Sequence, residues 1–237
     1  MSDKTPLILV PGLLCDAALW RAQIEELADI ADAIVADTTQ DDSLDGMAAR
    51  ILADAPETFA LAGLSMGGYC AQAVMRQAPE RVSRLALLDT SAEADTPART
   101  QIRLDWIAKA EAEGLDAVIP WHMESYFHPE HLKDRDMVAI AEASARTIGL
   151  EAYKRQQTAI AGRTDNHTQL AKIDCPTLLL CGRQDMATPL ALHERMAAVI
   201  PGDGRGAELT VIDDCGHLSP LERPAEVSAA LRQWLTN

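Results

Sequence analysis

Short apolar runs alternate with helix-like segments over most of this chain, and this alternation constrains the fold more than any other feature. Strands that alternate with helices are typical of a mostly parallel sheet covered by helices on both faces. We therefore expect an α/β fold whose sheet has about six strands. The runs predicted as strands are 7–10, 33–36, 58–62, 82–88, 177–181 and 208–212, and the predicted helices are 16–30, 43–53, 69–77, 190–199 and 224–235.

The alternation stops between residues 93 and 166, where the pattern is helical and no strand is predicted. Apolar residues recur at helical spacing there, as at Ile102, Trp106 and Ala110. An insertion after the fourth strand would lie over the carboxyl edge of the sheet, where ligands bind in folds of this class. We therefore expect a core of residues 1–92 and 167–237 and a helical cap of residues 93–166.

Charge and composition exclude several classes of function. The chain of 237 residues has a formal net charge of −15, which disfavours binding to nucleic acid or to an anionic membrane surface. No apolar segment approaches the roughly 18 residues of a membrane span. Pro11-Gly12 interrupts the apolar stretch within residues 1–15, so we interpret this stretch as part of the mature protein and expect a cytoplasmic location. The sequence does not indicate an oligomeric state.

The cysteines and histidines do not form a recognisable metal or disulfide pattern. The five cysteines are odd in number, lack C-x-x-C spacing and are expected to be reduced and mostly buried. The six histidines have no paired ligand spacing. We therefore expect neither a metal nor an organic cofactor.

A G-x-S-x-G motif at residues 63–67 lies between a predicted strand and a predicted helix. A serine in this position must form a sharp turn, and the flanking glycines relieve the crowding around it. Ser65 would then be exposed at a helix N-terminus, where developing negative charge is stabilised. The alternative is a glycine-rich turn that only permits close packing of helix and strand. A phosphate-binding loop is disfavoured because no lysine follows the glycines.

A serine nucleophile needs a base, and His217 has the most suitable position. It follows the last predicted strand after Gly216, at the same sheet edge as Ser65. His217 could also be a surface-loop residue. His122, His128 and His131 lie in the insertion and are interpreted as surface or cap residues, one of which could touch substrate. His167 and His193 do not follow a glycine turn of the kind that precedes His217.

Two aspartates could orient the imidazole of His217. Asp185 follows the strand at 177–181, and Asp89 follows the strand at 82–88. Asp89 directly precedes the predicted cap, where a turn or capping role is natural, so Asp185 is preferred.

The oxyanion of an acyl-transfer reaction also needs hydrogen-bond donors. The backbone N–H of Met66 is one candidate, and the loop after the first strand offers Leu13 as first choice and Leu14 as second. A plain strand-to-helix turn is the alternative for that loop. In the cap, Trp121, Met123 and Phe127, near Tyr126, could line an apolar substrate pocket or simply pack the cap on the core.

Taken together, several motifs of this chain resemble those of the α/β-hydrolase superfamily, and in particular small bacterial esterases and enol-lactonases. The resemblance extends over nearly the whole chain except the insertion. The motifs are Val10-Pro11-Gly12, Gly63-Leu64-Ser65-Met66-Gly67-Gly68, Pro79-Glu80-Arg81-Val82, Gly182-Arg183-Gln184-Asp185 and Cys215-Gly216-His217.

The resemblance implies Ser65 as nucleophile, His217 as base, Asp185 as acid and a cap over about 93–166, in the Ser, Asp, His order of these enzymes. Many members have His-Gly where this chain has Pro11-Gly12, so a side chain that often braces the oxyanion loop is missing. The expected activity is hydrolysis of a small-molecule ester or lactone. The alternatives are thioester or carbon–carbon bond hydrolysis, a biosynthetic elimination on the same triad, and a binding protein without turnover.

Overall fold

The computed structural model describes residues 4–237 and is built around a six-stranded sheet in which all neighbouring strands are parallel. The strand order is β2-β1-β3-β4-β5-β6, which confirms the predicted α/β fold of about six strands. The strands are β1 Thr5–Val10, β2 Ala31–Val35, β3 Phe59–Leu64, β4 Val82–Leu88, β5 Thr177–Gly182 and β6 Glu208–Ile212.

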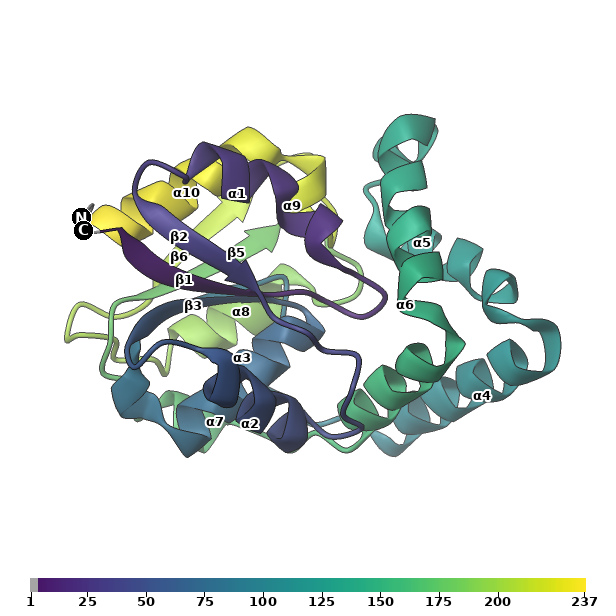
Figure 1. Cartoon of the computed structure of the whole chain (residues 1–237), viewed down its shortest axis with the longest axis horizontal. Helices are drawn as coiled ribbons and strands as arrows, with labels where there is room; N and C mark the ends of the chain where they lie inside the picture. Colours follow the sequence, from purple (N-terminus) through teal and green to yellow (C-terminus); the bar gives the residue numbers. More distant parts are fainter. Residues whose placement is uncertain (1–3) are drawn as a thin grey trace.

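Helices cover both faces of this sheet (Figure 1). Helices α1 (Arg21–Glu26) and α10 (Pro224–Thr236) contact one another on one face. Helices α2 (Leu44–Asp54), α3 (Met66–Gln77) and α8 (Leu190–Ala197) lie on the other face. The short helices are η1 Ala17–Trp20, η2 Pro79–Arg81, α7 His167–Leu170 and α9 Ser219–Glu222.

The first predicted helix, 16–30, is too long. Asp16 caps the 3-10 helix η1, and α1 then ends at Glu26. The N–H groups of Ile30 and Ala31 both donate to the Leu27 carbonyl, so the chain turns there and enters β2 two residues earlier than predicted. Apolar spacing alone does not predict such a turn, because Leu27 continues the helical apolar pattern and is buried in the core.

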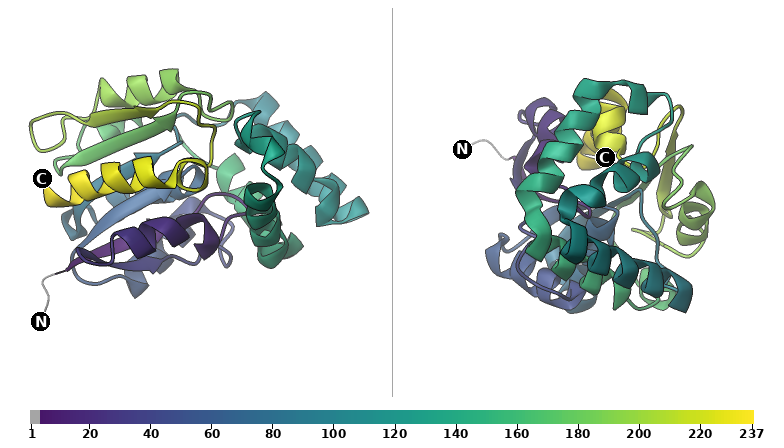
Figure 2. Two further views of the ribbon diagram at one scale, coloured as in Figure 1. Left: turned by 90° about the horizontal axis from the view of Figure 1, so that it is seen from above. Right: turned by 90° about the vertical axis from the view of Figure 1, so that its right-hand side faces the viewer.

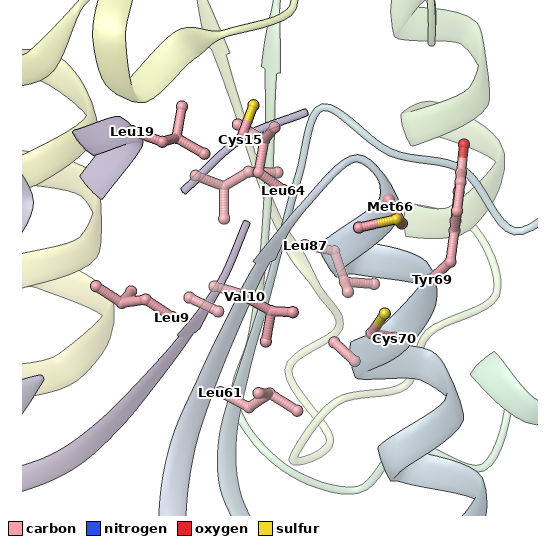
Figure 3. Packing of buried hydrophobic residues seen from close by; sticks show 14 of the residues in the cluster. Leu9, Val10, Cys15, Leu19, Leu61, Leu64, Met66, Tyr69, Cys70 and Leu87 are labelled. Carbon is pink, nitrogen blue, oxygen red and sulfur yellow. The ribbon is translucent and has the colours of Figure 1, made fainter. Parts of the chain in front are cut away.

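The central strands are buried on both faces, which explains their nearly continuous apolar sequences. All six residues of β3 are buried, and residues 7–10 of β1 are at most 3% exposed. Figure 3 shows Leu9 and Val10 of β1 pointing to opposite faces, with Leu87 and Cys70 on the side of α3. Truncating a buried leucine such as Leu61 to alanine would cost about 2–5 kcal/mol of stability. The strands therefore hold the loops at their carboxyl ends rigidly.

The segment between β4 and β5 forms a separate group of helices beyond the carboxyl ends of the strands, opposite the start of β1 and the C-terminus (Figures 1 and 2). The backbone N–H of Asn166 donates to the Ala92 carbonyl at 2.8 Å, which ties the two ends of the segment together. No strand occurs within residues 93–166, all of which are described. The division into core and cap at 92/93 and 166/167 stays a prediction. The helices are α4 Pro97–Glu113, η3 Leu115–Ala117, α5 Ile119–Tyr126, η4 His131–Lys133 and α6 Arg135–Ala161, which is broken at Gly149.

The predicted burial of the cysteines is confirmed, because all five are buried. No helix within residues 4–237 is long and apolar enough to cross a membrane. Of the N-terminal stretch interpreted above as mature protein, residues 1–3 lie outside the described residues.

Candidate active site

Backbone strain is concentrated at the carboxyl edge of the sheet. Among the described residues, the four non-glycine residues with positive φ all lie in loops that follow strands, where they cost about 1–3 kcal/mol each. Leu14 follows β1, Ser65 follows β3, Asp89 follows β4 and Asp214 follows β6. Such strain persists only where the surrounding structure enforces it, and this edge is therefore where a functional site is expected.

Ser65 occupies the sharp turn between β3 and α3, with φ 55° and ψ −114°. A Cβ added to Gly63 would lie 2.2 Å from the Gly67 carbonyl oxygen, and one added to Gly67 would lie 2.1 Å from that of Val10. Both glycines of the motif are therefore required by close backbone contact. The turn places the Ser65 hydroxyl in the wall of a cavity beneath the cap helices.

The structure brings Ser65 and His217 together across 152 residues of sequence. The His217 Nε2 atom lies 2.8 Å from the Ser65 Oγ atom, and the imidazole is only 2% exposed. Its Nδ1 atom lies 2.8 Å from Asp185 Oδ2. Because a carboxylate only accepts hydrogen bonds, Nδ1 carries the proton, and Nε2 accepts from the serine hydroxyl.

Asp185 accepts hydrogen bonds from further donors in addition to His217. Its Oδ1 atom accepts from the backbone N–H groups of Ala187 and Thr188, at 2.8 and 2.9 Å, and its Oδ2 atom accepts from the Thr188 hydroxyl at 2.7 Å. Burial opposes ionisation, but the charge and hydrogen bond of His217 together with the Thr188 donors lower the pKa of Asp185 to about 2. Burial likewise disfavours the imidazolium, yet the Asp185 carboxylate raises the pKa of His217 above its ordinary value.

Asp89 lies nearby but has a different set of partners. Its Oδ1 atom accepts from the Gly182 N–H at 2.9 Å, and its Oδ2 atom accepts from the N–H and hydroxyl of Ser219. It therefore ties the loops after β4, β5 and β6 together. Burial, and next the Asp185 carboxylate, raise the pKa of Asp89. The turn role predicted for Asp89 omitted this buried link.

The two predicted oxyanion donors have free N–H groups. Within residues 4–237, the backbone N–H groups of Leu13 and Met66 donate to no protein acceptor. The Leu14 N–H, the second choice, instead donates to the buried Gln156 Oε1 at 3.1 Å. Gln156 belongs to α6 and is fully buried, so a cap side chain braces the loop after β1. Gln156 thus compensates for the histidine that many family members have in place of Pro11, although it lies 145 residues away in the sequence.

Two residues that sequence reasoning did not single out for this role hold the His217 loop. The His217 N–H donates to the Tyr126 carbonyl, and the Tyr126 ring lies 5.4 Å from the imidazole. The buried Glu222 carboxylate accepts from the N–H groups of Gly216 and Leu218, which flank His217. Its other oxygen lies 2.7 Å from the His131 Nδ1 atom. The cap and the loop that carries His217 are therefore joined through these contacts.

The cavity above Ser65 has a volume of about 290 Å³ and is lined from both the core and the cap. Of the predicted pocket residues, Trp121 lines it, as does Tyr126. Met123 and Phe127 do not line it, which corrects the prediction. Both are buried in the hydrophobic cluster, since α5 turns about 100° per residue and Phe127 lies past its end in an extended conformation.

His122 is one of the three histidines interpreted as surface or cap residues, one of which could touch substrate. It is 3% exposed and lines the cavity, with its Nε2 atom 3.0 Å from the Tyr153 hydroxyl. Burial, and next the Arg103 charge, lower the pKa of His122 to about 3, so the ring is neutral. His193 is buried and accepts from the Thr90 N–H, and it does not line the cavity.

One buried group within residues 4–237 has the composition of a metal site. The ligand atoms of Asp89, Cys181 and Asp185 lie within 4.8 Å of one another. The Asp185 carboxylate already accepts hydrogen bonds from His217 and Thr188, and the Asp89 carboxylate accepts them from Gly182 and Ser219. Burial raises the pKa of the Cys181 thiol well above its ordinary value. These residues fit the hydrogen-bond network better than a cation, because the thiolate a metal requires is disfavoured.

Comparisons with known proteins agree with the observed fold. The model of the alpha/beta hydrolase family matches residues 7–230. The pimeloyl-[acyl-carrier protein] methyl ester esterase of Nitrosomonas europaea is 25% identical over 93% of this chain and 91% of its own length. A thermophilic esterase from Thermogutta terrifontis is 28% identical, with a TM-score of 0.88 over 98% of this chain and 89% of that chain. The enol-lactonase of Burkholderia xenovorans, 21% identical, has the same fold, with a TM-score of 0.88 over 99% of this chain and 92% of that chain.

Proposed function

Because this chain belongs to the alpha/beta hydrolase family, we propose that it is a serine hydrolase that cleaves a small carboxylic ester or lactone through an acyl-enzyme. The observation that carries the proposal is the hydrogen-bond chain from Asp185 through His217 to Ser65, which ends at a strained serine facing a cavity. The similar esterases of Nitrosomonas and Thermogutta support an ester as the substrate.

In the first half of the reaction, the Ser65 oxygen attacks the ester carbonyl as its proton moves to His217 Nε2. Asp185 stabilises the imidazolium that forms. The free N–H groups of Leu13 and Met66 receive the oxyanion, and the Gln156 contact to Leu14 holds the loop that carries Leu13. The tetrahedral intermediate then collapses, the carbon–oxygen bond breaks, and His217 returns the proton to the leaving alkoxide.

In the second half, His217 removes a proton from water as the water oxygen attacks the acyl-enzyme. The new tetrahedral intermediate expels the Ser65 oxygen, which regains the proton from His217, and the carboxylic acid leaves. With a lactone, the alcohol released in the first half remains attached to the acyl group. The cavity of about 290 Å³ lies at the lower end of the range of about 300–1,000 Å³ that is usual for small-molecule pockets, which favours small substrates.

A hydrolysis panel with wild type and Ser65→Ala tests this proposal. The substrates are 4-nitrophenyl esters of several chain lengths, an enol-lactone and an acyl-thioester. We expect Ser65-dependent hydrolysis of the short esters or the lactone. A strong preference for the thioester would assign the same residues to thioester hydrolysis. A well-folded protein without Ser65-dependent turnover of any substrate would contradict the proposal and favour a binding protein.

A further inference from the structure

The cavity above Ser65 has a charge opposite to that of the whole protein. The chain has 36 acidic and 21 basic residues. Nevertheless, the lining of the cavity includes the two arginines Arg99 and Arg103 and no aspartate or glutamate. Both arginines belong to α4, four residues apart and therefore on the same side of the helix. Both arginines therefore belong to the part of the lining that the cap supplies.

Arg103 is fixed with part of its guanidinium unused. Its Nε atom donates to Asp95 Oδ2, and its Nη1 atom donates to the Gln157 Oε1 atom at 2.9 Å. Gln157 cannot turn its carbonyl away easily, because its amide nitrogen donates to the Tyr153 hydroxyl at 3.0 Å. The Nη2 group of Arg103 donates to no group in residues 4–237. The arginine is thus preorganised and retains a free donor edge.

Asp95 does not neutralise the charge of Arg103, because it is shared. Its Oδ1 atom forms an ion pair with the Nη1 atom of Arg163, and its side chain is fully buried. Two guanidinium groups therefore face one carboxylate, which leaves one positive charge. The side chain of Arg103 is 21% exposed, so solvent screens this charge less than at the surface. His122 is neutral, as described above, and adds no second charge in the cavity.

Arg99 adds an arginine without an ion-pair partner at the rim. Its side chain is exposed, and no carboxylate within residues 4–237 lies within 4.0 Å of its guanidinium. By contrast, most other exposed arginines of the chain pair with an acidic neighbour, as Arg205 does with Asp203. An unpaired arginine at the rim would attract anions from a protein that otherwise repels them.

We propose that the substrate carries a carboxylate at the end remote from its scissile carbonyl, and that Arg103 binds this group with Arg99 assisting at the rim. The inference rests on the proposed function, since it names the substrate class of that same site. A carboxylate fits because its negative charge complements the surplus positive charge at Arg103. Its planar pair of oxygens also suits a guanidinium edge.

Matched substrate pairs test this inference. The first pair is the 4-nitrophenyl monoester of adipic acid and the corresponding ester of adipamic acid, which replaces the free carboxylate by a carboxamide of equal size. The second pair places the same groups on the alcohol, as phenyl acetates with a carboxylate or a carboxamide in the ring substituent. For each pair the readout is the ratio of the two kcat/KM values, which does not depend on the fraction of active enzyme.

We expect the wild type to prefer the carboxylate of one pair by about ten- to a hundredfold, as for a hydrogen-bonded charge pair. This corresponds to about 1.4–2.7 kcal/mol at about 1.36 kcal/mol per tenfold. Arg103→Gln should reduce the ratio to near one, and Arg99→Gln should reduce it a fewfold. Arg205→Gln is the matched control: it removes the same charge from an exposed ion pair in the loop that enters the amino end of β6, and it should leave the ratio unchanged.

A ratio near one for both pairs would overturn the inference, as would a preference that survives Arg103→Gln. The uncharged carboxamide esters separate this failure from failure of the proposed function. If only the carboxylate site is wrong, these esters are still hydrolysed in a Ser65-dependent manner. If the hydrolase proposal itself is wrong, no ester of either pair is hydrolysed in that way.

Discussion

Replacing Gln156 by leucine should impair catalysis as well as stability, although Gln156 lies in the cap and touches no substrate in the mechanism proposed above. The substitution keeps the approximate size of the side chain and removes the acceptor of the Leu14 N–H. It also removes the long hydrogen bonds from Gln156 Nε2 to the Thr38 hydroxyl and carbonyl, at 3.3 and 3.4 Å. The loop that carries the proposed Leu13 oxyanion donor then loses its brace.

The magnitude follows from two bounds. Leaving one buried N–H without a partner costs about 1–3 kcal/mol of stability. Deleting an oxyanion donor outright costs about 10²–10³ in kcat. Gln156→Leu displaces the loop without deleting the donor, so we expect kcat to fall about ten- to a hundredfold with a small change in KM.

The assay compares kcat for a 4-nitrophenyl ester with the free energy of unfolding. Gln72→Leu is the matched control, because Gln72 is also buried but donates to the Ser91 carbonyl and not to a catalytic loop. Both variants should lose similar stability, and only Gln156→Leu should lose kcat. Equal kcat values in the two variants, with both well folded, would refute the role given to Gln156.

Three further predictions concern the other parts of the site. His217 must be neutral to accept a proton, and Asp185 raises its pKa, so kcat/KM should fall as the pH drops through a value above 6.5. Asp185→Asn should lower that apparent pKa and cost about 10⁴ in kcat, whereas Asp89→Asn should stay within about tenfold of wild type. The reverse pattern in pH–rate profiles would assign the acid to Asp89. Glu222→Gln leaves one acceptor oxygen for four donors, so calorimetry should show that the free energy of unfolding falls by about 1–3 kcal/mol. Steady-state kinetics should show a roughly tenfold loss of kcat, and an unaltered kcat would contradict the role of Glu222 in holding the His217 loop. Dialysis against a chelator should leave the ester hydrolysis rate unchanged, and activity that returned only with a divalent ion would reject the proposed metal-free mechanism.

The sequence predicted the parts of this molecule that depend on local pattern. The strand over 82–88 was predicted at its observed bounds because a buried run between Pro79 and Asp89 has clear ends. Ser65, His217 and Asp185 could be associated before the structure was known, because each follows a strand of one parallel sheet. The three residues lie close together because of this sheet topology, since they are far apart along the chain.

The contacts between cap and core could not be predicted in this way. Gln156 reaches Leu14 over 142 residues, and Glu222 reaches His131 over 91 residues. These contacts depend on how α6 and the loop after α5 pack on the core, which helical periodicity does not specify. The same reason explains the error for Met123, since an apolar residue on a short helix suits a pocket and a core equally well.

Covalent labelling tests the central claim, that Ser65 is the nucleophile, most directly. The protein is incubated with a fluorophosphonate probe, and intact mass and peptide mass are measured for wild type and for Ser65→Ala. We expect one added probe in the wild type, located in the peptide that contains Ser65, and none in the variant, with both proteins folded. A folded wild type that stays unlabelled, or a label at another residue, would contradict it.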